Sequence, residues 1–440
     1  MRPCGPSRRR WATPPSSPSP TPSSGPTDEP PARTVGRTER ATGRPSPCGP
    51  VRDRAHAGAR TGEACVSDHE PRVVYGEAPD QEVRSLRVRR CLLRTARDEP
   101  VAELEAVSFR MRFGAVAVAA EGVGGVETQP AFRRQGHMGR LLRRALGGMA
   151  RRVDVAFVSE GIEGVYERFG FVGAVAEGHL VVPVRNVERA AGADPDAADP
   201  GIRSANPADL PAMVGLYNTA HAQRPWTHER HLGWNRLVPQ TTWKPGSHTL
   251  VLRTGRTIAG YAVLEGRAFG DPLGTLTVDE LVAEDAPATR RLLAAVARLC
   301  WQRRLGRFTV REPADSLTGR VARHMGCAYE QLFPPSGGMM AAVLNRPSLV
   351  RTVEPELRRR TGGQRPDTDR LLAIEALCGG DLFPDDRTLI RLLLGHWSAE
   401  DAYVHGAVVP DRYRDLCAAW FPGGGSRALP APYAHRLDRY

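Results

Sequence analysis

The 440-residue sequence has no closely spaced pair of cysteines and no long apolar run. Its eight cysteines are scattered, without the short paired spacings of a zinc ribbon or a disulfide framework. No window approaches the roughly 18 consecutive apolar residues of a membrane-spanning helix. No apolar segment follows Arg8, Arg9 and Arg10, as it would in a secretory signal. We therefore expect a cytoplasmic protein with reduced thiols that is neither secreted nor inserted in a membrane.

Acidic side chains are outnumbered by basic ones, which leaves a net charge of +12, and nearly all the basic residues are arginine. Such an excess favours anionic partners in general and does not separate a nucleic acid from an anionic cofactor. The heavy use of Arg, Ala, Gly and Pro is also typical of a GC-rich genome. Charge alone therefore assigns no function.

The length predicts two or three domains, because one domain usually spans roughly 100 to 200 residues. Residues 1–70 are rich in Pro, Ser, Thr, Arg and Gly and lack apolar periodicity, so they are expected to be disordered. These residues form a flexible tail, or they are not translated because the start codon is assigned too far upstream. The alternative is an arm that binds nucleic acid or a partner. Three ordered pieces are expected after them, at residues 71–190, 200–346 and 347–440.

Apolar patterns in the first two pieces follow one order. The first predicts strands at 91–95, 102–107, 115–120 and 153–159, with a helix at 138–151 before the last strand. The second predicts strands at 249–253, 257–265 and 276–282, followed by a helix at 286–303. The shared order suggests an internal duplication. In the third piece we expect helices at 387–394 and 410–420.

Residues 123–144 join an apolar strand to a helix through a basic turn. Pro130 ends the strand, Arg133 and Arg134 lie in the turn, and Gly136 precedes the helix. The first N–H groups of a helix lack intrahelical acceptors and carry the positive end of the helix dipole. A diphosphate can bind both, and glycine allows it close to the backbone. The segment predicts an anion site, although solvated surfaces also carry such turns.

Residues 126–139 resemble motif A of the GCN5-related N-acetyltransferases (GNAT), in which an Arg-x-x-Gly run binds the pyrophosphate of coenzyme A. Met138 departs from the small residue usual at its position. The run Ser159-Glu160-Gly161, followed by Tyr166-Glu167-Arg168-Phe169-Gly170-Phe171, resembles a segment of the enhanced-intracellular-survival (Eis-like) acetyltransferases.

This resemblance implies an α+β fold. It consists of tandem acyl-CoA N-acyltransferase domains, each a mixed sheet flanked by helices, and a small sterol-carrier-protein-like domain at 347–440. It further implies acetyl-CoA as co-substrate and no metal. The residues implied to bind acetyl-CoA are Val126, Glu127, Thr128, Arg133, Arg134, Gln135, Gly136, His137, Met138 and Gly139.

The resemblance also implies catalytic roles. Tyr166 would be the general acid that protonates the departing thiolate, because a phenol and a thiolate have comparable basicity; packing beside Phe169 and Phe171 is the alternative. The α-carboxylate of Tyr440 would be the base that deprotonates the amine. Glu160 is a rival that would bind substrate or relay a proton through water.

The second piece carries the acidic stretch 283–287 where the first has its basic turn, so we expect a degenerate copy that does not bind pyrophosphate. The residues His228-Glu229-Arg230-His231 lack the i,i+4 spacing of a helical zinc pair, which argues against a metal. Trp226 beside them is interpreted as a wall of the substrate pocket or as plain packing.

These observations predict an N-acetyltransferase of the acyltransferase class that acts on a primary amine, such as an aminoglycoside, a polyamine or a lysine side chain. Direct transfer is expected, because no cysteine lies in the motif to form an acyl-enzyme. We also expect a homo-oligomer without membrane or nucleic-acid partners. The alternative is a non-catalytic lipid- or nucleic-acid-binding protein that retains a vestigial acetyltransferase fold.

Overall fold

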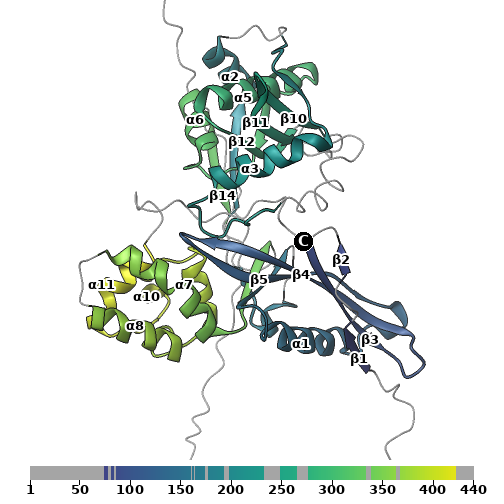
Figure 1. The fold of residues 1–440 in the computed structure, drawn as a ribbon, viewed down its shortest axis with the longest axis vertical. Coiled ribbons are helices and arrows are strands. Elements are labelled where there is room, and N and C mark those ends of the chain that lie inside the picture. The colour runs from purple at the N-terminus through teal and green to yellow at the C-terminus, as the bar shows by residue number, and fades with distance from the viewer. Residues whose placement is uncertain are drawn as a thin grey trace, which may run out of the picture. The chain divides into compact units, whose positions relative to one another are not determined.

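The computed structural model describes residues 74–77, 81–83, 86–159, 161–162, 164–173, 177–192, 198–231, 248–264, 276–332, 338–362 and 367–422 (Figure 1). The predicted tail at 1–70, Glu160 and Tyr440 lie outside the described residues. No helix in these ranges is both long and apolar enough to cross a membrane.

A long antiparallel hairpin forms the centre of the first sheet. It joins β4 (Pro100–Phe113) to β5 (Val116–Thr128), and Gly114 turns the chain between them with φ of 60°. The other strands are β1 (Val74–Glu77), β2 (Gln81–Val83), β3 (Leu86–Arg94), β6 (Val155–Ser159), β7 (Val172–Gly173) and β15 (Met339–Val343). The order is β1-β3-β4-β5-β6-β15-β7, with β2 paired to β3.

Helix α1 (His137–Met149) covers one face of this sheet (Figure 1). Leu141, Leu142, Ala145 and Met149 recur at helical spacing and are buried against strand residues such as Leu104. The helix predicted at 138–151 is therefore present. The strands predicted at 91–95, 102–107, 115–120 and 153–159 are present as parts of β3, β4, β5 and β6.

The second sheet follows the order β14-β8-β13-β12-β11-β10-β9. Its strands are β8 (Glu177–Pro183), β9 (Ile202–Ser204), β10 (His248–Thr254), β11 (Thr257–Leu264), β12 (Leu276–Ala283), β13 (Arg307–Val310) and β14 (Ala328–Leu332). The helices of this part are α2 (Val184–Ala191), α3 (Leu210–Ala220), α5 (Ala286–Gln302) and α6 (Leu317–Met325). The strands and the helix predicted between residues 249 and 303 are all present.

The two sheets exchange one strand each. Strand β8, whose residues fall within the first expected piece, lies between β13 and β14 of the second sheet. Strand β15, whose residues fall within the second expected piece, lies between β6 and β7 of the first. Alternate residues of β15 enter two cores: Met340 packs on the α1 side and Ala341 on the opposite side. The boundaries drawn at 190 and 200 therefore do not coincide with the edges of the sheets.

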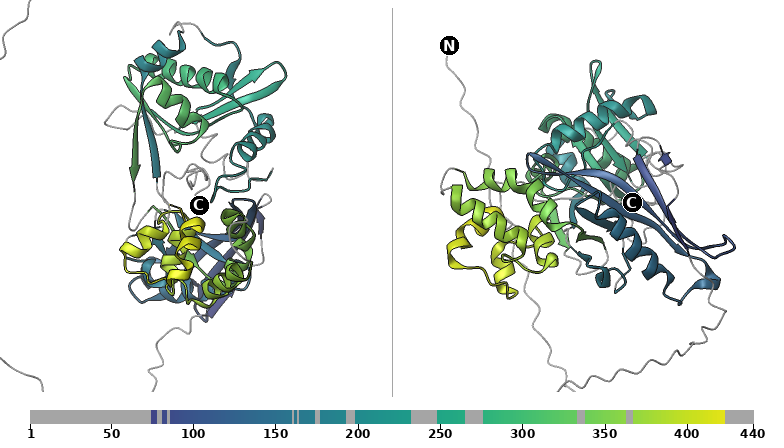
Figure 2. Two further views of the ribbon diagram at one scale, coloured as in Figure 1. Left: turned by 90° about the vertical axis from the view of Figure 1, so that its left-hand side faces the viewer. Right: turned by 60° about the horizontal axis from the view of Figure 1, so that its bottom comes forward.

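The described residues after β15 form helices only. These are α7 (Arg346–Thr361), α8 (Asp367–Gly379), α9 (Asp386–Leu393), α10 (Ala399–Val404) and α11 (Asp411–Trp420), yellow-green to yellow in Figure 2. Side-chain caps from Asn345, Asp385 and Ser398 begin three of them. Their apolar faces share one core with the β4–β5 hairpin. The expected sterol-carrier-protein-like domain is not confirmed, because 346–362 and 367–422 contribute no strand to either sheet.

Candidate active site

Strand β5 extends beyond the end of its pairing with the parallel strand β6. Its pairing with β6 ends at Val123 and Val158, whereas β5 continues to Thr128. The pairing of β5 with β4 also shifts register between Glu103 and Glu105, and Gly125 adopts a left-handed φ of 56° there. This is a β-bulge, which re-aims the backbone groups of the bulged strand. The end of β5 therefore presents backbone polar groups at an edge that β6 does not cover.

The chain then enters a tight basic turn. Pro130–Phe132 form a short 3-10 helix, and Arg134 adopts a left-handed φ of 63°, which is unusual for a residue with a side chain. Two side chains hold the turn: Arg133 Nε donates to the Thr128 carbonyl at 3.0 Å, and Gln135 Nε2 donates to the Ala131 carbonyl at 3.1 Å. Such strain persists only where neighbouring contacts fix it, and it often marks a functional turn.

Gly136 is the residue from which α1 begins. Its φ of 79° is left-handed, and it has no side chain with which to cap the helix. A Cβ built on Gly136 would meet no atom within 4 Å, so the space beside this helix start is open. Amide groups at an uncapped helix start, with Arg133 and Arg134 exposed beside them, form a suitable cradle for a diphosphate.

The next three residues serve the turn mainly through the backbone and through packing. The His137 side chain is buried, lies edge-on to Phe132, and has Nε2 at 3.3 Å from Gln135 Oε1. Met138 is half-buried in the α1 core. A Cβ on Gly139 would lie 3.6 Å from the Phe169 ring, so α1 and the segment after β6 approach closely here.

Tyr166 belongs to the same apolar cluster as Val126 and Met138. Its side chain is buried, and its ring lies edge-on to Phe171 with centroids 5.9 Å apart. Burial raises the pKa of the Tyr166 hydroxyl above its ordinary value. The fold therefore brings the predicted general acid to the core that also holds the motif, and keeps its phenol protonated at neutral pH.

Strand β15 contributes Met340, which is not among the site residues predicted from the sequence. A Cβ on Gly161 would lie 3.0 Å from the Tyr166 ring and 3.1 Å from Met340 Sδ, so Met340 packs beside the tyrosine. The C-terminal helices also reach this segment, since Arg387 Nη2 donates to the Glu167 carbonyl at 2.8 Å. No strand was predicted at 339–343, and an apolar run there would not by itself identify the sheet that it joins.

Trp226 lies elsewhere. It is fully buried between Phe113 and Phe157, and its indole N–H donates to the Leu393 carbonyl. The packing alternative describes this side chain, which has no exposed surface for a substrate to contact. Glu160 and Tyr440 are outside the described residues and keep the status of predictions.

A sequence profile of the acetyltransferase (GNAT) domain family matches residues 64–173, which contain the bulge, the turn, α1 and Tyr166. Residues 64–173 are therefore similar to the GNAT acetyltransferase domain family. No curated protein matches the chain.

The structure of a GCN5-related N-acetyltransferase from Anabaena variabilis ATCC 29413 shares the fold: TM-score 0.56, 12% identity, 80% of this chain and 89% of that chain covered. A GCN5-related N-acetyltransferase from Kribbella flavida has 17% identity and a TM-score of 0.44, and the match covers 59% of this chain and 61% of that chain. Eis1 from Mycobacterium abscessus has 18% identity and a TM-score of 0.42, and the match covers 60% of this chain and 66% of that chain. The chain thus spans less than two thirds of the last two GNAT structures.

Proposed function

We propose that this GNAT protein is an acetyl-CoA-dependent N-acetyltransferase that transfers the acetyl group directly to a primary amine. The main support is the uncapped start of α1 at Gly136, which follows a bulged strand end and a basic turn. The helix start and the basic turn offer a place for a diphosphate, and the bulged end of β5 offers one for a thioester carbonyl.

The proposed binding mode assigns the pyrophosphate to the α1 amides around Gly136, with Arg133 and Arg134 adding positive charge. The thioester carbonyl would accept hydrogen bonds from the β5 backbone between Val126 and Thr128, where pairing with β6 has ended. His137, Met138 and Gly139 would contribute backbone amides and the packing that fixes the helix start. Fixed backbone donors need no reorganisation during the reaction, which suits an oxyanion site.

The proposed reaction has one bond formed and one broken at the carbonyl carbon. The neutral amine attacks it, the C–S bond breaks, and the thiolate takes the proton of the Tyr166 hydroxyl. The phenol recovers a proton from solvent, and the amine proton passes to the α-carboxylate of Tyr440 or, through water, to Glu160. The raised pKa of Tyr166 keeps the proton available to the thiolate.

A cationic acceptor fits the charge around the bulge. Glu105 and Glu127 are exposed on the strands that form it, and the Glu105 carboxyl carbon lies 3.7 Å from the position of a Cβ on Gly125. Carboxylates raise the local concentration of a cationic amine. This favours polyamines, aminoglycosides and lysine side chains as acceptors.

The deciding assay follows thiol release from acetyl-CoA in the presence of a panel of these amines. We expect turnover with at least one amine and an acetyl-CoA-dependent rise in melting temperature, because a ligand that binds only the native state stabilises it. Absence of both effects with the full-length chain would overturn the proposal. A rise in melting temperature without turnover would leave a CoA-binding protein and remove the enzymatic part.

A further inference from the structure

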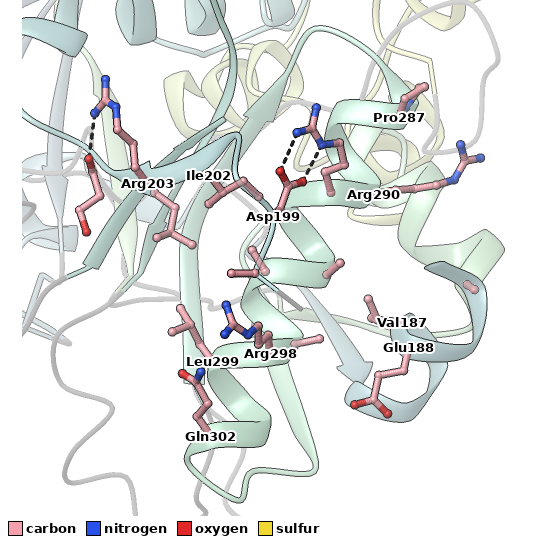
Figure 3. Close-up of a pocket in the computed structure, with 18 residues that line it drawn as sticks. Val187, Glu188, Asp199, Ile202, Arg203, Pro287, Arg290, Arg298, Leu299 and Gln302 are labelled. Carbon is pink, nitrogen blue, oxygen red and sulfur yellow. Dashed lines mark hydrogen bonds and ion pairs between the residues drawn. The ribbon is translucent and has the colours of Figure 1, made fainter. Parts of the chain in front are cut away.

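The second sheet carries a pocket that the proposed reaction does not use. It has a volume of about 830 Å³ and is lined by residues of α2, β9, β10, α5 and the segment before β9 (Figure 3). Pockets that bind small molecules usually measure about 300–1,000 Å³. None of its lining residues belongs to the turn at 129–136 or to α1.

Much of the lining is apolar. The apolar lining comes from Val187 on α2, Ile202 on β9, Leu250 on β10 and, on α5, Leu299 and three alanines. Figure 3 labels Val187, Ile202 and Leu299. Small alanine side chains leave room beside α5, and the branched residues provide contact area. The pocket therefore suits the apolar part of a ligand.

Two arginines of the pocket are already neutralised. Arg291 forms a bidentate ion pair with Asp199, with both N–O distances 2.7 Å (Figure 3). Arg203 is paired in the same way with Asp209, at 2.7 and 2.6 Å. Such planar pairs satisfy both guanidinium and carboxylate, so these arginines mainly fix the walls.

The other two arginines of the pocket, Arg290 and Arg298, form no ion pair within the part of the chain that the structure describes. The Nε of Arg298 is buried and has no hydrogen-bond acceptor there. A buried donor without an acceptor is rare in folded proteins and calls for a partner. Among the lining residues, Glu188 on α2 is the carboxylate that takes part in neither of these two ion pairs, and no ion pair joins it to Arg298 on α5 within the described residues.

We propose that this pocket binds a small amphiphile with one anionic head group and an apolar body. The head group accepts hydrogen bonds from Arg298, with Arg290 adding positive charge at the rim, and the apolar body lies along the α5 alanines. Two properties follow: neither a neutral chain nor a short anion binds as well as a molecule that has both parts. The proposal does not depend on acetyltransferase activity.

Calorimetric titration of the full-length chain tests it with dodecanoate, dodecyl phosphate, dodecanol and acetate as probes. We expect one site for the two anionic chains and at least tenfold weaker binding of dodecanol and acetate. Comparing dodecanoate with dodecyl phosphate separates a carboxylate preference from a phosphate preference. Saturation with acetyl-CoA should leave this binding unchanged.

Three variants locate the site. Arg298→Met removes the charge and keeps the apolar stem, and should weaken dodecanoate binding at least tenfold. Arg320→Met makes the same change of charge on α6 outside the pocket and should have no effect. Ala294→Phe fills the pocket and should abolish binding, with the melting curve of each variant reporting its fold.

Equal losses in Arg298→Met and Arg320→Met would overturn the site, as would equal binding of dodecanoate and dodecanol. Competition between dodecanoate and acetyl-CoA would place the amphiphile at the cofactor site and overturn this pocket too. Failure of every probe to bind the unmodified chain would have the same consequence. None of these results bears on whether the protein acetylates an amine.

Discussion

In the first sheet, α1 begins at Gly136, which has no side chain to cap the helix, and a Cβ built there would meet no atom within 4 Å. In the second sheet, α5 occupies the same place in the chain order, after β12 and before the parallel strand β13. There the residue before the helix is Asp285, whose carboxylate accepts the Ala288 N–H at 2.7 Å. The α1 start therefore has no side-chain cap at Gly136, whereas the α5 start is capped by Asp285 of its own chain.

The strand ends differ in the same way. Val126 lies three residues beyond Val123, the last β5 residue paired with β6, and Leu281 lies three beyond Val278, the last β12 residue paired with β13. The Leu281 N–H donates to Glu312 Oε1 at 3.4 Å, and the Thr318 hydroxyl donates to the Leu281 carbonyl at 2.9 Å. The backbone that would receive a thioester is thus hydrogen-bonded internally in the second sheet.

The second sheet also contains buried polar side chains that pair with one another near this strand end. Arg230 and Glu280 form a fully buried bidentate pair at 2.8 and 2.7 Å, and the Tyr261 hydroxyl donates to Glu280 at 2.6 Å. Burial and the nearby Glu280 raise the pKa of Glu312 to about 8. The comparison teaches that one order of strands and helices can carry an uncapped helix start in one sheet and, in the other, a start capped by Asp285 together with a closed polar core.

The largest expected effect comes from Tyr166→Phe. Loss of the acid should lower kcat roughly 10²–10⁴-fold while leaving the KM for acetyl-CoA within a few fold. The matched change in the second sheet is Thr318→Val. Tyr166 lies eight residues after Val158, the last β6 residue paired with β5, and Thr318 lies eight residues after Val310, the last β13 residue paired with β12. Thr318→Val should leave kcat unchanged and reduce stability by about 1 kcal/mol through the lost hydrogen bond. Equal kcat for Tyr166→Phe and the unmodified enzyme would remove the tyrosine from the mechanism.

The second effect concerns the pH dependence of unfolding. A folded-state pKa of about 8 for Glu312, against an ordinary value of 4.5, means that the native state keeps a proton that the unfolded state loses. This group therefore reduces stability as pH rises from about 4.5 to about 8, by at most about 1.4 kcal/mol per pH unit. Glu312→Gln should gain stability over the unmodified protein as pH rises through that window.

Denaturant titrations at pH 5, 6, 7 and 8 measure this difference. The exposed Glu284→Gln is the control for removal of one carboxylate nearby. A stability difference that is constant across the four pH values would contradict the buried, protonated state of Glu312.

The third effect is on cofactor affinity. Gly136→Val places a β-branched residue at φ of 79°, which costs roughly 1–2 kcal/mol if the turn keeps its shape. We expect acetyl-CoA affinity to fall about tenfold or more as the amides reorient to relieve that strain. Asp285→Ala removes the α5 cap and should cost about 1 kcal/mol of stability without changing acetyl-CoA affinity. Isothermal titration that finds both variants equally weakened would erase the distinction between the two helix starts.

The smallest expected effect comes from Arg134→Gly. Glycine tolerates the left-handed conformation of this residue, so stability should change by less than about 1 kcal/mol, with the relief of strain opposed by the added chain entropy of glycine. Acetyl-CoA affinity should nevertheless fall several-fold at low salt and by less at high salt, because the contribution of Arg134 is a screened charge. A loss that does not depend on salt would assign the effect to the turn geometry instead.

Much of the first site could be predicted because its signals are local. An apolar strand, Pro130, two arginines, Gly136 and an amphipathic helix follow one another within 30 residues, and backbone geometry depends mainly on such near neighbours. Met340 could not be placed beside Tyr166 in this way, because an apolar run reports that a strand is buried but not which strand it pairs with. The helices predicted at 387–394 and 410–420 are present as α9 and α11, because their pattern is local. The sterol-carrier-protein-like fold expected for this part rested on the resemblance alone and is not confirmed.

The sequence by itself determined the order of strands and helices, the basic turn at 129–136 and the acidic start of α5, since each depends on residues close along the chain. Only the tertiary structure decided the exchange of β8 and β15, the burial of Trp226 and the internal satisfaction of the Leu281 backbone by Glu312 and Thr318. These features join residues more than 30 positions apart, and their pairing is selected by the packing of whole sheets, which no local pattern encodes.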